Sequence, residues 1–305
     1  MATVQATIHG QTYTLTYNSS TGKYEATLTA PNASSFPLTD GYYPVLVTAT
    51  DEAGNSTTVT DKHATLGGSL KLYVKEKIKP VITILSPTSG AAIITSNPTI
   101  KFKVLDNALQ SSGFSGVDAS SITLTVGGNA VDNSKITKTA VAGGYECTYT
   151  PEAALPDGNC TVTVNTSDND GNAADTVSTT FKIDTVAPTL NVTSPADGLI
   201  TNQAELTVSG TTSDATSSPV TVTITVGGVD QGAVTIGSDG AFSKVIALAN
   251  GANTIVITAT DSSGKVSTIT RTVTLKTTAP VIKSVSITPN PVDCGKTYII
   301  SVDVE

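Results

Sequence analysis

Apolar and polar residues alternate along most of the chain, and one alternating segment occurs three times. The copies are residues 42–55, 159–172 and 252–265. In each copy the alternation follows an Asp-Gly or Asn-Gly turn and ends at an aspartate, with a glycine three residues later. The equivalent residues are Asp51, Asp168 and Asp261, followed by Gly54, Gly171 and Gly264. We predict a half-buried strand and a tight hairpin in each copy, with the aspartate capping the turn and the glycine taking positive φ.

Further strand-like segments repeat around this hairpin at a spacing of about 90–110 residues, and no window of about 12 residues has a helical period. Pro80, Pro188 and Pro280 each begin a similar leading pair of strands. About seven short strands per repeat predict an all-β chain of tandem immunoglobulin-like β-sandwich domains, arranged as a rod by short linkers that contain proline. The predicted domains are residues 1–78, 79–185 and 186–277, followed by a two-strand segment at 278–305.

The first predicted domain lacks strands that the last segment has in excess. The first domain has no leading pair of strands, whereas the last segment is a leading pair with no domain after it. A row of large apolar side chains left in water would forfeit about 1.5–3 kcal/mol each, and two strands alone are marginally stable. The residues proposed for assembly are Val285, Ile287, Tyr298, Ile300, Val302 and Val304 at the C-terminal end, and Val4, Ala6 and Ile8 at the N-terminal end.

We hypothesise that the C-terminal pair completes an N-terminal domain by strand addition, more readily in another copy than in its own chain. The products would be a head-to-tail fibre or a closed ring. Two alternatives stay open: the pair docks on a different protein, or it belongs to a longer chain.

Charge and composition exclude several classes of partner. A net charge of −8 disfavours nucleic acid and anionic membranes, and no run of about 18 apolar residues predicts a membrane span. Three cysteines cannot all pair internally, which is typical of a protein made in a reducing cytosol. Because Met1 leads directly into an alternating strand, we expect synthesis in the cytoplasm without a signal peptide.

Calcium is the one cofactor that the sequence brings into question, and we expect none to be required. Asp168 and Asp170 lie in a hairpin whose spacing fails the EF-hand pattern, so turn geometry explains them. Asp106 and Asp118 flank a glycine-rich loop and could join a carboxylate cluster, but we favour a solvated loop.

The first domain carries an insertion near residues 61–68, which provides a candidate binding loop at Asp61, Lys62 and His63. It would equally serve to cover an open sheet edge. Two separated histidines form no triad or metal set, and no nucleophile–base pair is evident, so we predict that the chain is not an enzyme. Cys147 and Cys160 are interpreted as packing residues, with a disulfide between them as the alternative.

The ATDEAGN hairpin at residues 49–55, the Lys-Pro and Ala-Pro junctions and the SGVD segment at 115–118 resemble bacterial Ig-like domains. Such domains occur in surface adhesins and in structural proteins of phage and phage-like tails. The resemblance implies a non-enzymatic structural or attachment protein of a tail, found in the particle or outside the cell after lysis. Its partners would be itself or another tail protein, and a cell-surface glycan remains a candidate. The alternative is an adhesin stalk that binds host glycan or protein through its loops.

Overall fold

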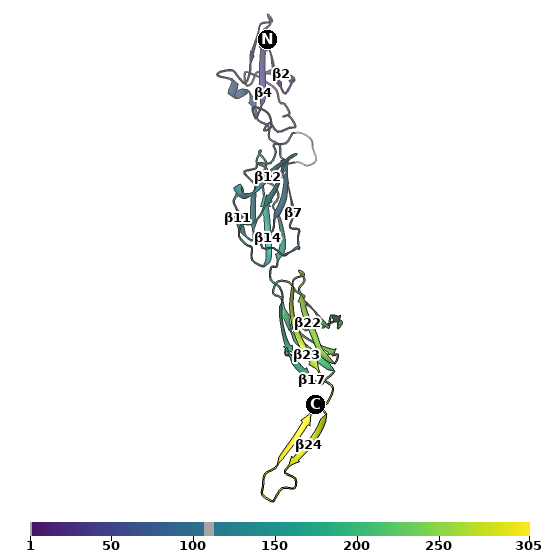
Figure 1. The fold of residues 1–305 in the computed structure, drawn as a ribbon. Coiled ribbons are helices and arrows are strands. Elements are labelled where there is room, and N and C mark those ends of the chain that lie inside the picture. The colour runs from purple at the N-terminus through teal and green to yellow at the C-terminus, as the bar shows by residue number, and fades with distance from the viewer. Residues whose placement is uncertain (1, 107–112) are drawn as a thin grey trace. The chain divides into compact units, whose positions relative to one another are not determined.

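The computed structural model describes residues 2–106 and 113–305, and their regular structure is strand apart from two short 3-10 segments (Figure 1). These segments are η1 (Gly67–Leu70) and η2 (Asn133–Lys135). The all-β prediction is therefore confirmed. The chain divides into two compact units, residues 1–185 and 186–305. The predicted boundary after residue 78 lies inside the first unit and stays a prediction.

The first unit begins with a single sheet in the order β3-β2-β1-β4-β5, with β6 paired to β4. Its strands are β1 (Thr3–Ile8), β2 (Gln11–Asn18), β3 (Lys23–Glu25), β4 (Tyr43–Thr50), β5 (Ser56–Val59) and β6 (Lys71–Leu72). Within the described residues 2–78, every strand belongs to this sheet. One of its faces carries Val4, Ala6 and Ile8 beside Val45 and Val47, because alternate residues of a strand share a face.

Two sheets packed on one core follow in the same unit. One has the order β11-β10-β14-β15-β8 and the other β12-β13-β9-β7. Ile100, Phe102 and Val104 of β9 are fully buried against Val162 and Val164 of β14 within this core. The strands are β7 (Val81–Ser86), β8 (Ala92–Ile93), β9 (Ile100–Leu105), β10 (Thr123–Val126), β11 (Asn129–Val131), β12 (Thr137–Val141), β13 (Gly144–Tyr149), β14 (Gly158–Asn165) and β15 (Val177–Ile183).

The second unit repeats this sandwich with sheets β16-β18-β21 and β17-β23-β22-β19-β20. In both sandwiches a short early strand pairs in parallel with the last strand, β8 with β15 and β17 with β23. Ile255 and Ile257 of β22 are fully buried in its core. The strands are β16 (Thr189–Ser194), β17 (Leu199–Thr201), β18 (Glu205–Ser213), β19 (Thr221–Val226), β20 (Val229–Asp230), β21 (Ala241–Ala247), β22 (Gly251–Thr260) and β23 (Val266–Leu275).

The chain ends in a two-stranded antiparallel sheet, β24 (Ile282–Thr288) and β25 (Ile299–Val304), drawn in yellow in Figure 1. Val285 pairs with Val302, and Ile287 pairs with Ile300, so these four side chains share one face. Every residue of both strands is exposed. The predicted leading pair is thus formed, and its apolar face is bare among the residues that the structure describes.

The first sheet departs from the sequence-based expectation in strand length. Apolar residues alternate from Tyr24 to Ala30, a pattern typical of a strand, yet β3 ends at Glu25. Its counterpart β13 pairs with both β12 and β9, whereas β3 pairs with β2 alone. A strand with one partner lacks half of the hydrogen bonds that hold a central strand in place, which explains the early end.

Candidate functional site

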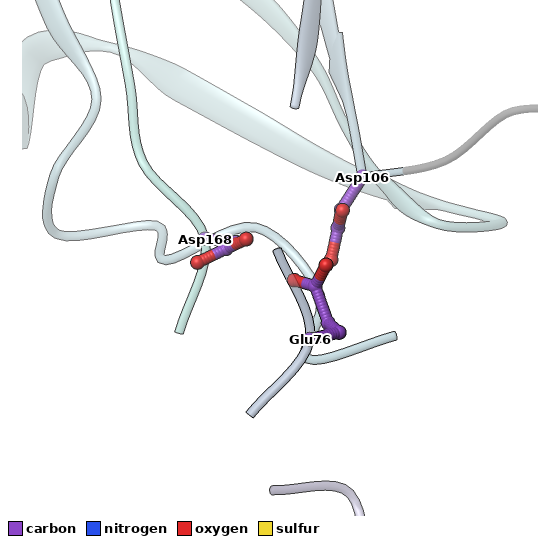
Figure 2. Close-up of side chains that lie close together, drawn as sticks. All are labelled: Glu76, Asp106 and Asp168. Carbon is purple, nitrogen blue, oxygen red and sulfur yellow. The ribbon is translucent and has the colours of Figure 1, made fainter. Parts of the chain in front are cut away.

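Three carboxylates from distant parts of the chain meet at one end of the sandwich that contains β9 and β14. Glu76, Asp106 and Asp168 each bring a carboxylate oxygen to within 4.8 Å of the others (Figure 2). Glu76 lies in the extended segment after β6, Asp106 directly follows β9, and Asp168 begins the turn after β14. The first unit therefore contains a compact acidic cluster.

The hairpin turn places Asp168 as the sequence predicts. Its Oδ1 accepts a hydrogen bond from the Asn172 backbone N–H at 2.7 Å, and Gly171 takes a φ of 93°. The same cap recurs at Asp51 and Asp261. The side-chain amide of Asn172 donates to the other carboxylate oxygen of Asp168 at 2.6 Å. These bonds fix the carboxylate while it is almost fully buried.

Asp106 is also fully buried, and the solvated-loop interpretation of this residue is wrong. The physical reason lies in the strand before it. Ile100, Phe102 and Val104 point into the core, and Asp106 is the next residue in the same alternation. Its Oδ2 accepts a hydrogen bond from the Gly116 backbone N–H at 2.7 Å, but its Oδ1 has no hydrogen-bond partner among the described residues.

Sequence reasoning missed Glu76, which the cluster receives from the segment between β6 and β7. Its Oε1 accepts from Asn172 Nδ2 at 3.0 Å and from Ser115 Oγ at 3.4 Å, and its Oε2 accepts from the Ile78 backbone N–H. A repeat comparison could have found it. In the sequence, Glu76 stands as far before Pro80 as Asp184 stands before Pro188.

The electrostatics of the cluster are unfavourable for three ionised groups. Burial, a hydrogen bond shared with Asp168 and the nearby charges raise the pKa of Glu76 to about 7. Burial, with further contributions from the charges of Asp168 and Asp170, also raises the pKa of Asp106. The nearby lysines are engaged elsewhere: Lys75 Nζ donates to the Asp170 backbone oxygen at 3.0 Å, and Lys79 pairs with Asp175.

Asp118 and Asp170, the other two calcium candidates, lie outside the cluster. Asp118 accepts hydrogen bonds from the Ser120 N–H at 2.8 Å and from its hydroxyl at 2.6 Å, which lower the Asp118 pKa. Asp170 accepts from the Glu76 N–H at 2.9 Å and so holds the Glu76 segment from outside. The structure thus unites Asp106 and Asp168 and gives the other two positioning contacts.

The candidate binding loop bonds to its own sheet. Asp61 accepts a hydrogen bond from the Tyr42 hydroxyl at 2.9 Å and pairs with Lys62 at 3.0 Å. The His63 Nδ1 accepts from the Leu66 N–H at 3.2 Å. Tyr42 and Tyr43 are buried, whereas the neighbouring Tyr73 is 66% exposed. Both the binding and the covering interpretations of this loop stay predictions.

The two internal cysteines are free and buried. Cys147 belongs to β13 and Cys160 to β14, which lie in opposite sheets of one sandwich, and Cys294 is exposed. Their interpretation as packing residues agrees with this placement.

Paired sheets around a single core, repeated in the second unit, define the class: these are immunoglobulin-like β-sandwich domains. Residues 96–185 match the family model of the bacterial Ig-like domain, so the chain contains a domain of that family. Residues 188–277 match the family model of glucodextranase domain B. Comparison with curated proteins gives no match.

Solved structures with the same kind of fold come from varied sources. The fibronectin(III)-like modules of Clostridium thermocellum CbhA are 17% identical, with 64% of this chain and 94% of that one covered and a TM-score of 0.35. Three N-terminal domains of the bacteriophage RB49 outer capsid protein Hoc are 14% identical over 91% and 89% of the two chains, with a TM-score of 0.39. A bacterial ice-binding adhesin is 20% identical over 90% and 87%, with a TM-score of 0.32.

No helix among residues 2–106 and 113–305 is long and apolar enough to cross a membrane.

Proposed function

We propose that the protein is a non-enzymatic structural or attachment component of a phage or phage-like tail, whose Ig-like domains assemble by strand complementation between copies. In this proposal it acts within the particle, or outside the cell after lysis, and its partner is a second copy of itself. A different tail protein is the other candidate partner.

The observation that carries this proposal is the bare apolar face of the C-terminal two-stranded sheet. Val302 is 50% exposed and Ile300 is 57% exposed. In the first sandwich, the corresponding leading strand β9 buries Ile100, Phe102 and Val104 completely. Burying a large apolar side chain contributes about 1.5–3 kcal/mol, so the four side chains of this face favour association with a partner surface.

The first sheet offers a surface of the matching kind. Val4, Ile8, Val45 and Val47 are only half-buried, whereas Ile122, Val126, Val162 and Val164, at the equivalent positions, are buried. A pocket of about 380 Å³ opens beside this face. Its lining includes Ile8, Tyr13, Leu28 and Leu72. In the next sandwich of the chain, a second layer of strands covers the equivalent face. A leading pair of strands from another copy would supply that layer for the first sheet.

The geometry of such an exchange sets the products. Because donor and acceptor are different surfaces of one chain, the contact is heterologous, and repetition gives an open fibre or a closed ring. Both forms suit a repeated structural component.

An adhesin stalk is the alternative function, and one observation favours it. Tyr73 exposes 66% of its surface, and its ring lies 5.8 Å from the ring of Tyr42, over which Lys71 is placed at 4.9 Å. An exposed aromatic ring beside cationic groups is suited to binding a sugar or a protein loop. Loss of glycan or host-cell binding in Tyr73→Ala, with unchanged assembly, would support this alternative.

The experiment that tests assembly measures the mass of the full chain by analytical ultracentrifugation across a range of concentrations. We expect oligomers in the wild-type protein and a monomer in the double variant Ile300→Lys/Val302→Lys. The matched control is Ser286→Lys/Ser301→Lys, which adds the same charges to the opposite face of the same two strands. A wild-type protein that is monomeric at all concentrations, or oligomers that persist in the apolar-face variant, would overturn the proposal.

A further inference from the structure

We propose that Glu76, Asp106 and Asp168 bind one calcium ion, which joins the segment after β6 to the end of the adjacent sandwich. The inference concerns a site that assembly does not involve, and it stands independently of the proposed function.

The size of the cluster fits one ion. Calcium binds six to eight oxygens at about 2.3–2.6 Å, so two ligands on opposite sides of the ion lie about 5 Å apart. The three carboxylate oxygens all lie within 4.8 Å of one another. Figure 2 shows the three side chains converging from separate segments of the chain.

The buried oxygen of Asp106 is the second and independent observation. Asp106 is fully buried, and its Oδ1 has no hydrogen-bond partner within the described part of the chain. Burying an unpaired carboxylate oxygen is costly, and native proteins rarely leave such an atom without a partner. Because Asp106 is a member of the converging set, a cation among the three carboxylates would supply the missing contact.

The charges around the cluster favour a cation over any other ligand. No described lysine or arginine forms an ion pair with Glu76, Asp106 or Asp168. The donors that reach these carboxylates are neutral: the Asn172 amide, the Ser115 hydroxyl and backbone N–H groups. A divalent ion would neutralise most of a local charge that hydrogen bonds alone leave in place.

The ligand atoms select calcium among the common cations. The cluster contains only carboxylates, with no cysteine or histidine, so zinc is disfavoured. Magnesium demands near-ideal octahedral geometry at about 2.0–2.1 Å, whereas calcium accepts irregular sets of carboxylates, carbonyls and water. Three carboxylates from three separate loops form an irregular set of that kind.

The position of Glu76 gives the ion a structural effect. Glu76 is the one ligand from outside the sandwich, and its segment contains Lys75 and Lys77, which are cleavage sites for trypsin. A bound ion would hold this segment against the Asp106 and Asp168 loops. Calcium binding and protection of the segment from trypsin are therefore expected to occur together.

The experiment titrates calcium chloride into the metal-free full chain at pH 7.5 by calorimetry and follows trypsin cleavage after Lys75 and Lys77. We expect a dissociation constant of about 0.1–1 mM, in the range of extracellular calcium modules, and cleavage that slows as the site fills. In Asp106→Asn and in Glu76→Gln we expect at least a tenfold loss of affinity and no protection. Magnesium chloride at equal concentration should protect much less.

The matched control is Asp118→Asn, which removes a neighbouring carboxylate that hydrogen-bonds only within its own turn. It should bind calcium as the wild type does. Circular dichroism verifies that each variant is folded. Binding that survives both Asp106→Asn and Glu76→Gln, or a wild-type chain that binds no calcium at 10 mM (about ten times the upper end of the expected range), overturns the proposal. Repeating the titration in the Ile300→Lys/Val302→Lys background separates this result from assembly.

Discussion

The side-chain amide of Asn172 donates a hydrogen bond to the Glu76 carboxylate at 3.0 Å and another to the Glu76 backbone oxygen at 3.1 Å. One residue of a hairpin turn therefore holds both the backbone and the side chain of the segment that leads into the sandwich. The same amide also bonds to Asp168, so a single side chain contacts two of the three carboxylates.

Replacing Asn172 with alanine should lower the free energy of unfolding of the first unit by about 1–3 kcal/mol, because buried carboxylate oxygens lose their donor. The control is Asn55→Ala, at the equivalent position of the first hairpin. Asn55 donates to Asp51 at 2.9 Å in an exposed turn. Its loss should cost less than about 1 kcal/mol. Urea denaturation measures both, and equal losses would contradict the role assigned to Asn172.

Phe102 lies at the centre of the first sandwich and is fully buried. Phe102→Ala should lower the free energy of unfolding by about 3–5 kcal/mol through lost burial and the cavity left behind. Val81→Ala, in the neighbouring strand β7, removes a side chain that is already 56% exposed. We expect a change below about 1 kcal/mol for that control, since surface substitutions have small effects. Thermal unfolding and chemical unfolding should both show the larger loss of stability in Phe102→Ala.

Gly210 on β18 is packed so closely that an added Cβ would lie 2.1 Å from the Asn191 backbone oxygen and 2.8 Å from the Phe242 ring. Gly210→Ala should therefore destabilise the second unit by about 1–3 kcal/mol, because the backbone of two paired strands would have to move. Gly68→Ala provides the control, since an added Cβ there meets nothing within 4 Å. A Gly210→Ala protein as stable as wild type in calorimetry would show that the strands can separate without cost.

The three thiols should differ sharply in reactivity. Burial raises the pKa of the Cys147 thiol to about 11 and also raises the pKa of Cys160, whereas Cys294 is exposed. Since the thiolate is the reactive species, a disulfide reagent at pH 8 should modify one thiol per folded chain and three after denaturation. Peptide mapping identifies the modified residue. Rapid modification of Cys147 in the folded protein would contradict the packed core.

Regular alternation made the sandwiches predictable from sequence. The inward positions of β9 and β14 are Ile, Phe, Val and Cys at every second residue. At the turns, few residues other than Asp and Gly fit the backbone conformation. Strand length in the first sheet was not predictable in this way. Whether residues after Glu25 stay in a strand depends on a partner from a distant segment, and local pattern does not encode that partner.

In the acidic cluster, too, local sequence pattern identified some residues and missed those that depend on distant segments. Asp168 was identified from its hairpin, and Asp106 was noticed but assigned to solvent, because the loop after it is rich in glycine and serine. Continuing the alternation of β9 by one step would have placed Asp106 inside. Glu76 could be found only by comparing segments before successive junction prolines, since its partners lie far away in the chain.

The parallel pairing of an early strand with the last strand, β8 with β15 and β17 with β23, has a mechanical consequence. Tension applied to the two ends of such a sandwich pulls these neighbours in opposite directions along their length. All the hydrogen bonds between them, such as those around Ile200 and Thr274, are then loaded at once and in shear. Each sandwich should resist stretching more strongly than one whose terminal strands could be peeled apart bond by bond.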